Sequence, residues 1–562
     1  MVAHRLTVRT AARLLDTGLI TSEQLASFCY SLAVAGEDIW GLNAYTNLVN
    51  RKELLDQARA SDERRKHGEV LSVFDGIPIS IKANLAVESQ GLSAGSLILG
   101  MGRRDGSKCG YDADTVRILL RDCGALFVGM TSMDEFGMGS LGNNSRTPDG
   151  DVRVTKNPLP YLRNLRLEDS SSAISEDESL ANVIRLSQSE ILEKHKDAID
   201  SPEQAIFSAG GSSCGSAASV AHGSALLSLG TDTGGSVRLP SAWCGLVGLK
   251  PSYGLLSRHG VVTYASSFDT VGVLARSVDC ATHALEVLAK KDKASRDSTI
   301  SSSNFVTTQL KGETPCSNSF LSGIRVGVPC SFSVKECPPA ITQAWSNAAQ
   351  LLQKQGASIE EIGTDEISPS LVQNALAAYY VLVSAEASSN LSRYDGFRYG
   401  VASESGVFSK DDADSDLTAL ERQYSATRMK GFGTEVSRRI LCGTSVLSSD
   451  RFHSHYEGAA KLRAALAHEL NAVLQEKVDL LLIPTVLSLP PRIDREQPDN
   501  TAMFSNDIMT VPASLAGLPS VSIPVPIDGE GTFMGAFQLI GSRLREDIVL
   551  KAGGILEAAN SS

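Results

Sequence analysis

The spacing of hydrophobic residues changes along the chain between that of helices and that of strands. Within residues 1–70, apolar side chains recur at the i, i+3, i+4, i+7 spacing of one helix face, at Leu25, Phe28, Cys29 and Leu32. From residue 76 to residue 82, isoleucines alternate with other residues, which predicts a strand. This strand carries Lys82 on the face opposite the isoleucines.

Further segments extend this alternation to the end of the chain. The pattern predicts helices over residues 114–121 and from residue 546 onward, and strands over residues 125–130, 324–328, 479–484 and 520–526. Mixed signals of this kind are typical of α/β proteins, in which helices cover a sheet. We therefore expect one large α/β domain, built on a mixed β-sheet with helices on both faces.

Residues 161–207 differ from the rest of the chain in composition. They contain runs of serine and of acidic residues, and acids outnumber bases. We interpret them as a polar, acidic insertion that is helical in part, over residues 182–196. The predicted organisation is an N-terminal helical part (residues 1–70), a core in two pieces (71–160 and 208–555), and the insertion (161–207) between the two pieces.

The amino terminus permits two interpretations. Arg5, Arg9 and Arg13 precede the first acidic residue, which is typical of an organelle-targeting helix. Alternatively, these residues belong to the first surface helix of the folded chain, because leucines and an isoleucine at positions 14, 15, 19 and 20 continue an apolar stripe. A helix of the folded chain would begin by about Thr7.

Composition excludes several classes of protein. The chain has 52 Lys and Arg against 64 Asp and Glu, a net charge of −12, so it is a poor candidate for holding a phosphate backbone by itself. No apolar stretch approaches the roughly 18 residues of a membrane span. The ten cysteines are scattered without a CxxC pair, as expected of thiols in a reducing compartment. No metal site is predicted, because His453 and His455 lack further ligands nearby.

Two glycine-flanked serine clusters carry the strongest chemical signal. Residues 210–216 read GGSSCGS and residues 230–236 read GTDTGGS, with a helix of small residues predicted between them. Glycines let backbone N–H groups converge on one point, as an oxyanion pocket requires. The clusters match neither the phosphate-loop nor the dinucleotide fingerprint. A tight packing corner is the structural alternative.

A serine nucleophile needs a base. His222, the one histidine between the clusters, has no evident orienting acid, which argues against a Ser-His-Asp triad. Lys82 can serve if burial lowers its pKa from about 10.4 toward neutrality, and it lies in an otherwise apolar strand. Taken alone, Lys82 would be interpreted as an exposed lysine of an edge strand.

Three segments resemble the amidase signature family: GIPISIKANL (residues 76–85), GGSSCGSAAS (210–219) and GTDTGGSVRLPSAWCGLVGLKPSYG (230–254). Members of this family hydrolyse amides with a Ser–Ser–Lys triad. The resemblance implies that Ser236 is the nucleophile, Ser212 the bridging serine and Lys82 the terminal base. It also implies that the oxyanion pocket is lined by the backbone N–H groups of Thr233, Gly234, Gly235 and Ser236.

Other segments are similar to one branch of this family, the glutaminase subunits of tRNA-dependent amidotransferases. They are MDEFGMGS (133–140), SRYDGFRYG (392–400), GTEVSRRILCGTSVLSS (433–449) and NDIMTVPASLAGLPSVSIP (506–524). The resemblance implies glutamine as the substrate, with Arg439 holding its α-carboxylate and Asp507 its α-ammonium group. Taken alone, Arg439 would be a solvated helix residue and Asp507 a loop acid.

The same resemblance implies a multisubunit complex. Ammonia would pass to a B-type partner subunit, which uses ATP and Mg to amidate Glu-tRNA(Gln), and a small C- or F-type subunit would complete the assembly. This chain would use no cofactor of its own and bind no membrane. The insertion and the basic amino terminus favour the mitochondrial matrix. The alternatives are a free-standing amidase of small carboxamides or fatty amides, and a non-catalytic scaffold subunit.

Two positions depart from the family pattern. Cys214 stands where glycine is usual, which crowds the loop and introduces a thiol that is expected to be redox-sensitive. Ala83 stands where an aspartate is common, so a negative charge beside Lys82 is missing, which favours the neutral amine. The insertion precedes the serine clusters directly, where it would shield or obstruct the site.

Overall fold

The computed structural model describes residues 6–100, 108–147, 149–167, 175–199, 205–290, 295–301, 321–401, 417–494, 502–527 and 532–561. The helices are α2 (Val8–Asp16), α3 (Ser22–Asp38), α4 (Arg51–His67), α5 (Asp114–Arg117), α6 (Leu159–Leu162), α7 (Glu176–Ile184), α8 (Gln188–Asp197), α9 (Cys214–His222), α10 (Arg238–Trp243), α11 (Val278–Leu288), α12 (Pro339–Lys354), α13 (Pro369–Leu391), α14 (Ala419–Gly431), α15 (Thr434–Val446), α16 (Glu457–Ala472), α17 (Val511–Leu515) and α18 (Glu546–Ser561). The strands are β1 (Tyr45–Leu48), β2 (Pro78–Lys82), β3 (Leu126–Thr131), β4 (Ser145–Arg146), β5 (Val152–Arg153), β6 (Leu227–Asp232), β7 (Val247–Lys250), β8 (Thr270–Ala275), β9 (Arg325–Pro329), β10 (Ser358–Ile362), β11 (Leu480–Pro484), β12 (Ser520–Val525) and β13 (Gly535–Gly541).

One mixed sheet organises the described chain, with its strands in the order β1-β3-β2-β6-β8-β7-β12-β13-β11-β9-β10. At one end β3, β2 and β6 are parallel, and at the other β11, β9 and β10 are parallel. The strands between these ends pair antiparallel. The predicted mixed sheet is confirmed.

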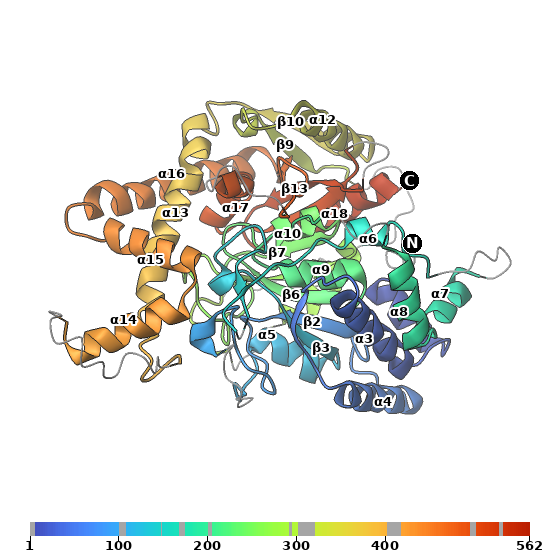
Figure 1. Ribbon diagram of the computed structural model, residues 1–562. Coiled ribbons are helices and arrows are strands. Elements are labelled where there is room, and N and C mark those ends of the chain that lie inside the picture. The colour runs from blue at the N-terminus through green and yellow to red at the C-terminus, as the bar shows by residue number, and fades with distance from the viewer. Residues whose placement is uncertain are drawn as a thin grey trace.

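Helices cover both faces of this sheet, as predicted (Figure 1). Successive side chains of a strand point to opposite faces. On β12, Val521 lies against Gly553 of α18, whereas its neighbour Ser520 points to the other face of the sheet. Ser520 donates to Gln538, which also accepts a hydrogen bond from Arg238 of α10. Helices α10 and α18 therefore occupy different faces.

A group of long helices packs beside the sheet (Figure 1). Helix α13 contacts both α15 and α16 along its length, and α17 packs against α13 as well. Helix α13 also reaches the second serine cluster, where its Tyr379 lies against Gly234. Among the described residues we find no helix whose length and hydropathy would suit a membrane span.

The N-terminal part is helical over most of its described length, but the prediction missed strand β1. This strand pairs antiparallel with β3 and has four residues, too few for a spacing pattern to reveal it. Helix α2 begins after Thr7, whose side chain caps it, and Leu14 is fully buried in the core. Residues 8–16 are therefore part of the packed fold, while Arg5 lies outside the described residues.

The described part of the insertion forms two short helices instead of one. Helices α7 and α8 each begin with a capping box, at Ser175 and Ser187, and both pack against α3. His195 of α8 meets His222, the last residue of α9, with their Nε2 atoms 3.0 Å apart. Helix α9 spans about 13 Å at 1.5 Å per residue. The described helices of the insertion thus meet α9 at the end remote from the serines.

Candidate active site

Lys82 lies at the end of β2 with its side chain sealed from solvent. Its side chain points to the face of β2 opposite Ile79 and Ile81, as the alternation predicted. Its Nζ contacts Ser212 Oγ at 2.8 Å, and it donates to Thr231 Oγ1 at 2.9 Å. The side chain is 0% exposed, so the interpretation as an exposed edge lysine is wrong.

The environment of Lys82 shifts its amine toward the neutral form. Burial lowers the pKa of Lys82 from 10.5 to about 8, against the opposing effect of carboxylates that include Asp134 and Asp232. A neutral amine has a lone pair, so the contact between Nζ and Ser212 Oγ can carry a proton from the hydroxyl to the amine. The pair has the geometry of a buried proton acceptor and its hydroxyl relay.

Ser212 is fixed by a loop that admits no side chain at the preceding residue. A Cβ on Gly211 would lie 2.0 Å from Asp134 Oδ2, so only glycine fits there. The Asp134 backbone N–H donates to the Ser212 carbonyl at 3.2 Å, and its carboxylate accepts backbone N–H groups of Gly142 and Asn143. The peptide bond between Gly211 and Ser212 is cis.

The two serine clusters meet directly. The Ser213 backbone N–H donates to the Ser236 carbonyl at 3.1 Å, and the Ser213 hydroxyl donates to the Thr231 carbonyl at 3.3 Å. From residue 208 to residue 244 every residue is buried except Ser236, which is partly exposed. The structure thus brings Lys82, Ser212 and Ser236 to one place and leaves Ser236 as the member that a ligand can reach.

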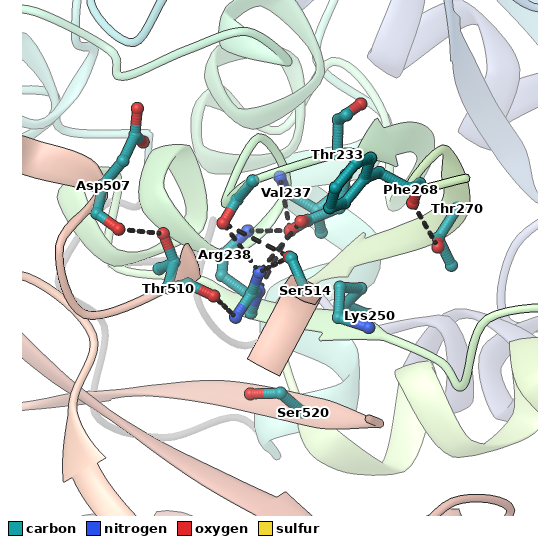
Figure 2. A network of polar contacts seen from close by, with 12 residues as sticks. Thr233, Val237, Arg238, Lys250, Phe268, Thr270, Asp507, Thr510, Ser514 and Ser520 are labelled. Atoms are coloured by element: carbon teal, nitrogen blue, oxygen red, sulfur yellow. Dashed lines mark hydrogen bonds and ion pairs between the residues drawn. The ribbon is translucent and has the colours of Figure 1, made fainter. Parts of the chain in front are cut away.

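A buried ion pair fixes the chain on both sides of Ser236. Arg238 and Asp232 are both 0% exposed and are joined by two hydrogen bonds of 2.9 and 3.0 Å. Arg238 also donates to the carbonyl of Thr510 (Figure 2). It donates to Gln538 Oε1 of β13 as well, so it ties the loop to the C-terminal part of the chain. Despite burial, which alone would raise it, Arg238 holds the pKa of Asp232 below its ordinary value.

This ion pair sets the direction of the glycine loop, residues 234–236. The Gly234 carbonyl accepts from Arg238 Nη2 at 3.1 Å and from Ser514 Oγ at 3.3 Å (Figure 2). A trans peptide places its N–H opposite its carbonyl, so the Gly235 N–H points away from Arg238. Within the described part of the chain, no acceptor meets the backbone N–H groups of Gly234, Gly235 or Ser236. These donors are available to the oxygen of a ligand.

Arg439 and Asp507 lie on two sides of one tyrosine. The Arg439 Nε donates to Glu435 Oε1 at 2.7 Å, and its guanidinium lies 5.1 Å from the ring centroid of Tyr380. The Tyr380 hydroxyl donates to Asp507 Oδ2 at 2.8 Å. Arg439 is 5% exposed and Asp507 is 9% exposed, so neither is a solvated surface residue. Burial raises the pKa of Asp507 to about 6, so the carboxylate is mostly ionised at pH 7.

Residues next to this charged pair in sequence or in space border the glycine loop. A Cβ on Gly234 would lie 2.6 Å from the hydroxyl of Tyr379, the neighbour of Tyr380 on α13. A Cβ on Gly235 would lie 2.2 Å from Thr510 Oγ1, and Thr510 Oγ1 donates to the Asp507 carbonyl at 3.2 Å (Figure 2). The loop is therefore packed directly against the elements that carry the charged pair.

The structure gives no support for a redox-sensitive thiol at Cys214 or for a catalytic base at His222. Burial raises the pKa of the Cys214 thiol to about 12, and reactive thiols are exposed and acidic instead. The expected redox sensitivity has no support here. Burial also lowers the pKa of His222 well below its ordinary value, and its partner is His195, not a serine.

Several polar residues of the site escaped the sequence analysis: Thr231, Asp232, Arg238, Tyr264, Asp269 and Tyr380. Asp232 and Arg238 lie inside a segment already singled out, and an acid and a base six positions apart among small residues were an available signal. The others reach the site through tertiary packing, for which residue spacing carries no signal. No group of three or more His, Cys, Asp or Glu side chains among the described residues is arranged to hold a metal ion.

Comparison with known families matches most of the chain. The family model described as Amidase matches residues 34–164 and 199–550. The unmatched residues 165–198 fall within the predicted insertion, whose bounds stay a prediction.

Individual proteins match over nearly the whole chain. The mitochondrial A-type subunit of glutamyl-tRNA(Gln) amidotransferase from Emericella nidulans is 35% identical, over 89% of this chain and 93% of that protein. Its namesake from Bos taurus is 35% identical over 95% of this chain and 90% of that protein. The solved structure of the A-type subunit of glutamyl-tRNA(Gln) amidotransferase from Thermotoga maritima is 25% identical with a TM-score of 0.64, covering 98% of this chain and 94% of that one.

Proposed function

Because the chain belongs to the amidase family, we propose that it is the glutamine-hydrolysing subunit of a glutamyl-tRNA(Gln) amidotransferase. The observation that carries the proposal is one continuous site. A buried Lys82–Ser212 pair and the partly exposed Ser236 lie in loops packed next to a cation, Arg439, and an anion, Asp507, which contact the same tyrosine. A free amino acid with an amide side chain has the complementary groups.

In the proposed acylation step, Ser236 Oγ attacks the side-chain carbonyl carbon of glutamine. Its proton passes to Ser212 Oγ while the Ser212 proton passes to the neutral Lys82 Nζ. The carbonyl oxygen becomes an oxyanion that the N–H groups of Gly234 and Gly235 bind. The carbon–nitrogen bond then breaks as the Ser212 hydroxyl gives its proton to the departing nitrogen and recovers one from Lys82. The products are ammonia and a glutamyl ester of Ser236.

In the second step, water hydrolyses this ester. The relay removes a proton from the attacking water, and the ester bond breaks as Ser236 Oγ recovers a proton. Glutamate leaves and the three residues return to their starting protonation states. The same Lys82 acts as a base in the attack and, once protonated, as an acid for the leaving group, so no external base is consumed.

The proposed complex divides the work among subunits. Ammonia passes to a B-type subunit, which uses ATP and Mg²⁺ to convert Glu-tRNA(Gln) to Gln-tRNA(Gln), and a small C- or F-type subunit completes the assembly. This chain needs no cofactor of its own. Its net charge of −12 agrees with leaving the tRNA to a partner. We place the complex in the mitochondrial matrix. The relatives from Emericella nidulans and Bos taurus, whose names call them mitochondrial, support a mitochondrial location.

The test is to measure ammonia release from glutamine with a coupled enzymatic assay. The purified chain is measured alone, and then with candidate partner subunits, Glu-tRNA(Gln) and ATP·Mg. Release that depends on the partners supports the proposal. Hydrolysis of many small amides without partners supports a free-standing amidase instead, and inactivity on every substrate supports a scaffold.

Ser236→Ala is the decisive variant because it removes one oxygen atom from a partly exposed side chain. Turnover is expected to fall by at least about 10⁴-fold, since no nucleophile remains. The unfolding free energy is expected to change by less than about 0.5 kcal/mol, as for other exposed positions. Wild-type ammonia release from this variant would exclude Ser236 as the nucleophile.

A further inference from the structure

Asp269 is a buried carboxylate whose two oxygens hold two different walls of the site. It directly precedes β8 and is 5% exposed. Its Oδ1 accepts a hydrogen bond from Thr233 Oγ1 at 2.8 Å. Its Oδ2 accepts the backbone N–H groups of Tyr264 at 2.9 Å and Ala265 at 3.0 Å.

The first oxygen fixes the entrance of the glycine loop. Thr233 stands between Asp232, which Arg238 holds, and Gly234, the first glycine of the loop. Side chains of consecutive residues at the end of a strand point to opposite sides. Asp269 therefore holds the chain on one side while Arg238 holds it on the other.

The second oxygen fixes the tyrosine that contacts Arg439. The Tyr264 hydroxyl accepts a hydrogen bond from Arg439 Nη1, and the guanidinium lies 5.8 Å from the Tyr264 ring centroid. The backbone of this tyrosine is held at its N–H by Asp269 and at its carbonyl by Asn390 Nδ2, at 3.2 Å. Moving Asp269 would move the Tyr264 backbone and, with it, a contact of Arg439.

We propose that Asp269 is a positioning residue that holds the glycine loop and Arg439 at a fixed position relative to each other. Its role toward Arg439 rests on the function proposed above. A glutamine held at its α-carboxylate must present its amide carbon to Ser236 at one distance. Effective attack requires this distance to be set before the reaction begins. A single carboxylate that bonds both walls supplies that constraint.

The chemistry of the position suits a carboxylate. Three donors converge on Asp269, and an ionised carboxylate accepts all three, one at Oδ1 and two at Oδ2. A leucine of similar size accepts none of them. Asp269 also borders a polar cavity of about 220 Å³ that Arg258 lines. Burial raises the pKa of Asp269 to about 6, with the Thr233 hydroxyl and Arg258 among the groups that oppose this rise, so it is ionised at pH 7.

The loop half of the proposal is tested with a small ester that lacks an α-carboxylate. Thr233→Val removes the hydroxyl that Asp269 accepts, and kcat is expected to fall about 10- to 100-fold, while Thr233→Ser keeps the hydroxyl and restores most of it. Thr270→Val is the matched control: its hydroxyl donates to the Phe268 carbonyl instead, at 3.0 Å (Figure 2), and kcat is expected to stay within about threefold.

The coupling is tested by adding Asp269→Leu, which removes both accepting oxygens. The double variant with Thr233→Val is expected to be no worse than Asp269→Leu alone, within about threefold, because both remove one interaction. Losses that multiply, or a Thr233→Val enzyme with wild-type kcat, would overturn the proposal. The Thr233 variants decide this half even if Asp269→Leu fails to fold.

The substrate half is tested with glutamine as the substrate. Asp269→Leu is expected to lower kcat and also to raise the KM for glutamine about tenfold or more, whereas Thr233→Val lowers kcat alone. Tyr264→Phe should reproduce the rise in KM. An unchanged KM in Asp269→Leu would refute the link to Arg439. If the wild-type complex uses no glutamine, the proposed function fails, and the ester results still decide the role of Asp269 in the loop.

Discussion

The pH dependence of turnover follows from the burial of Lys82 and can be predicted closely. The relay needs an amine without its extra proton, and burial lowers the pKa of Lys82 from 10.5 to about 8. The rate of ester hydrolysis, as kcat/KM, should therefore rise about tenfold per pH unit below pH 8 and level off above it. An arginine in place of Lys82 keeps its proton at every accessible pH. Lys82→Arg should thus be inactive, with no rise.

The size of the effect follows from the same shift. At pH 7 a lysine with a pKa of about 8 is neutral in about one molecule in ten, against about one in three thousand at 10.5. Burial thus raises the active fraction about 300-fold, which corresponds to about 3 kcal/mol of differential stabilisation. The lowered pKa makes the unfolded state bind more protons between pH 8 and pH 10.5. Stability should therefore rise with pH across that window, and the full penalty is present below pH 8.

The assay is hydrolysis of a chromogenic small ester from pH 6 to pH 10. Lys250 provides a matched control, because it is also buried with a lowered pKa, about 7, but its Nζ donates to the Pro251 carbonyl at 3.0 Å. Lys250→Met should keep the midpoint near 8. A flat profile from pH 6 to pH 9, or a midpoint above 10, would refute the idea that neutral Lys82 is the base.

Three further substitutions test the rest of the site. Arg439→Ala should lower kcat/KM for glutamine at least about 100-fold, because the charged hydrogen bonds to the α-carboxylate are lost. The loss on an ester without an α-carboxylate should be much smaller, and equal losses would contradict the assignment of Arg439. Arg238→Met leaves Asp232 buried without its partner and should lower the unfolding free energy by about 3–5 kcal/mol in urea; a loss under 1 kcal/mol would contradict the role of the ion pair. Gly235→Ala places a Cβ 2.2 Å from Thr510 Oγ1 and should lower kcat, and an added Thr510→Ala should restore part of it; no recovery would contradict the steric account.

The sequence predicted those parts of the molecule that depend on local spacing. The alternating isoleucines gave β2 and the direction of Lys82, and the small residues between the clusters gave α9. The sheet itself was expected as mixed, yet its order could not be predicted, because neighbouring strands such as β7 and β12 lie far apart in sequence. Strand β1 was missed because its four residues are too few to show an alternating pattern.

The candidate site divides in the same way. Ser212 and Ser236 could be predicted from the sequence, because the glycines beside them indicate a backbone that packs closely against its neighbours. Arg439 read as a solvated residue because it follows another arginine on a polar helix. Its burial depends on Tyr264 and Tyr380, which come from two other segments. Buried charge becomes recognisable only after its partners are placed beside it.

The burial of the relay has a consequence for the fate of the proton. Lys82 is 0% exposed and Ser212 is 1% exposed, whereas Ser236 is partly exposed. A substrate bound at Ser236 would therefore lie between the relay and bulk water. In the proposed mechanism, the proton that Lys82 accepts during the attack stays on the relay until the departing nitrogen takes it, because the sealed amine has no contact with bulk water. Sealing the amine thus contributes twice: it lowers the pKa that makes Lys82 a base, and it keeps the proton for the leaving group.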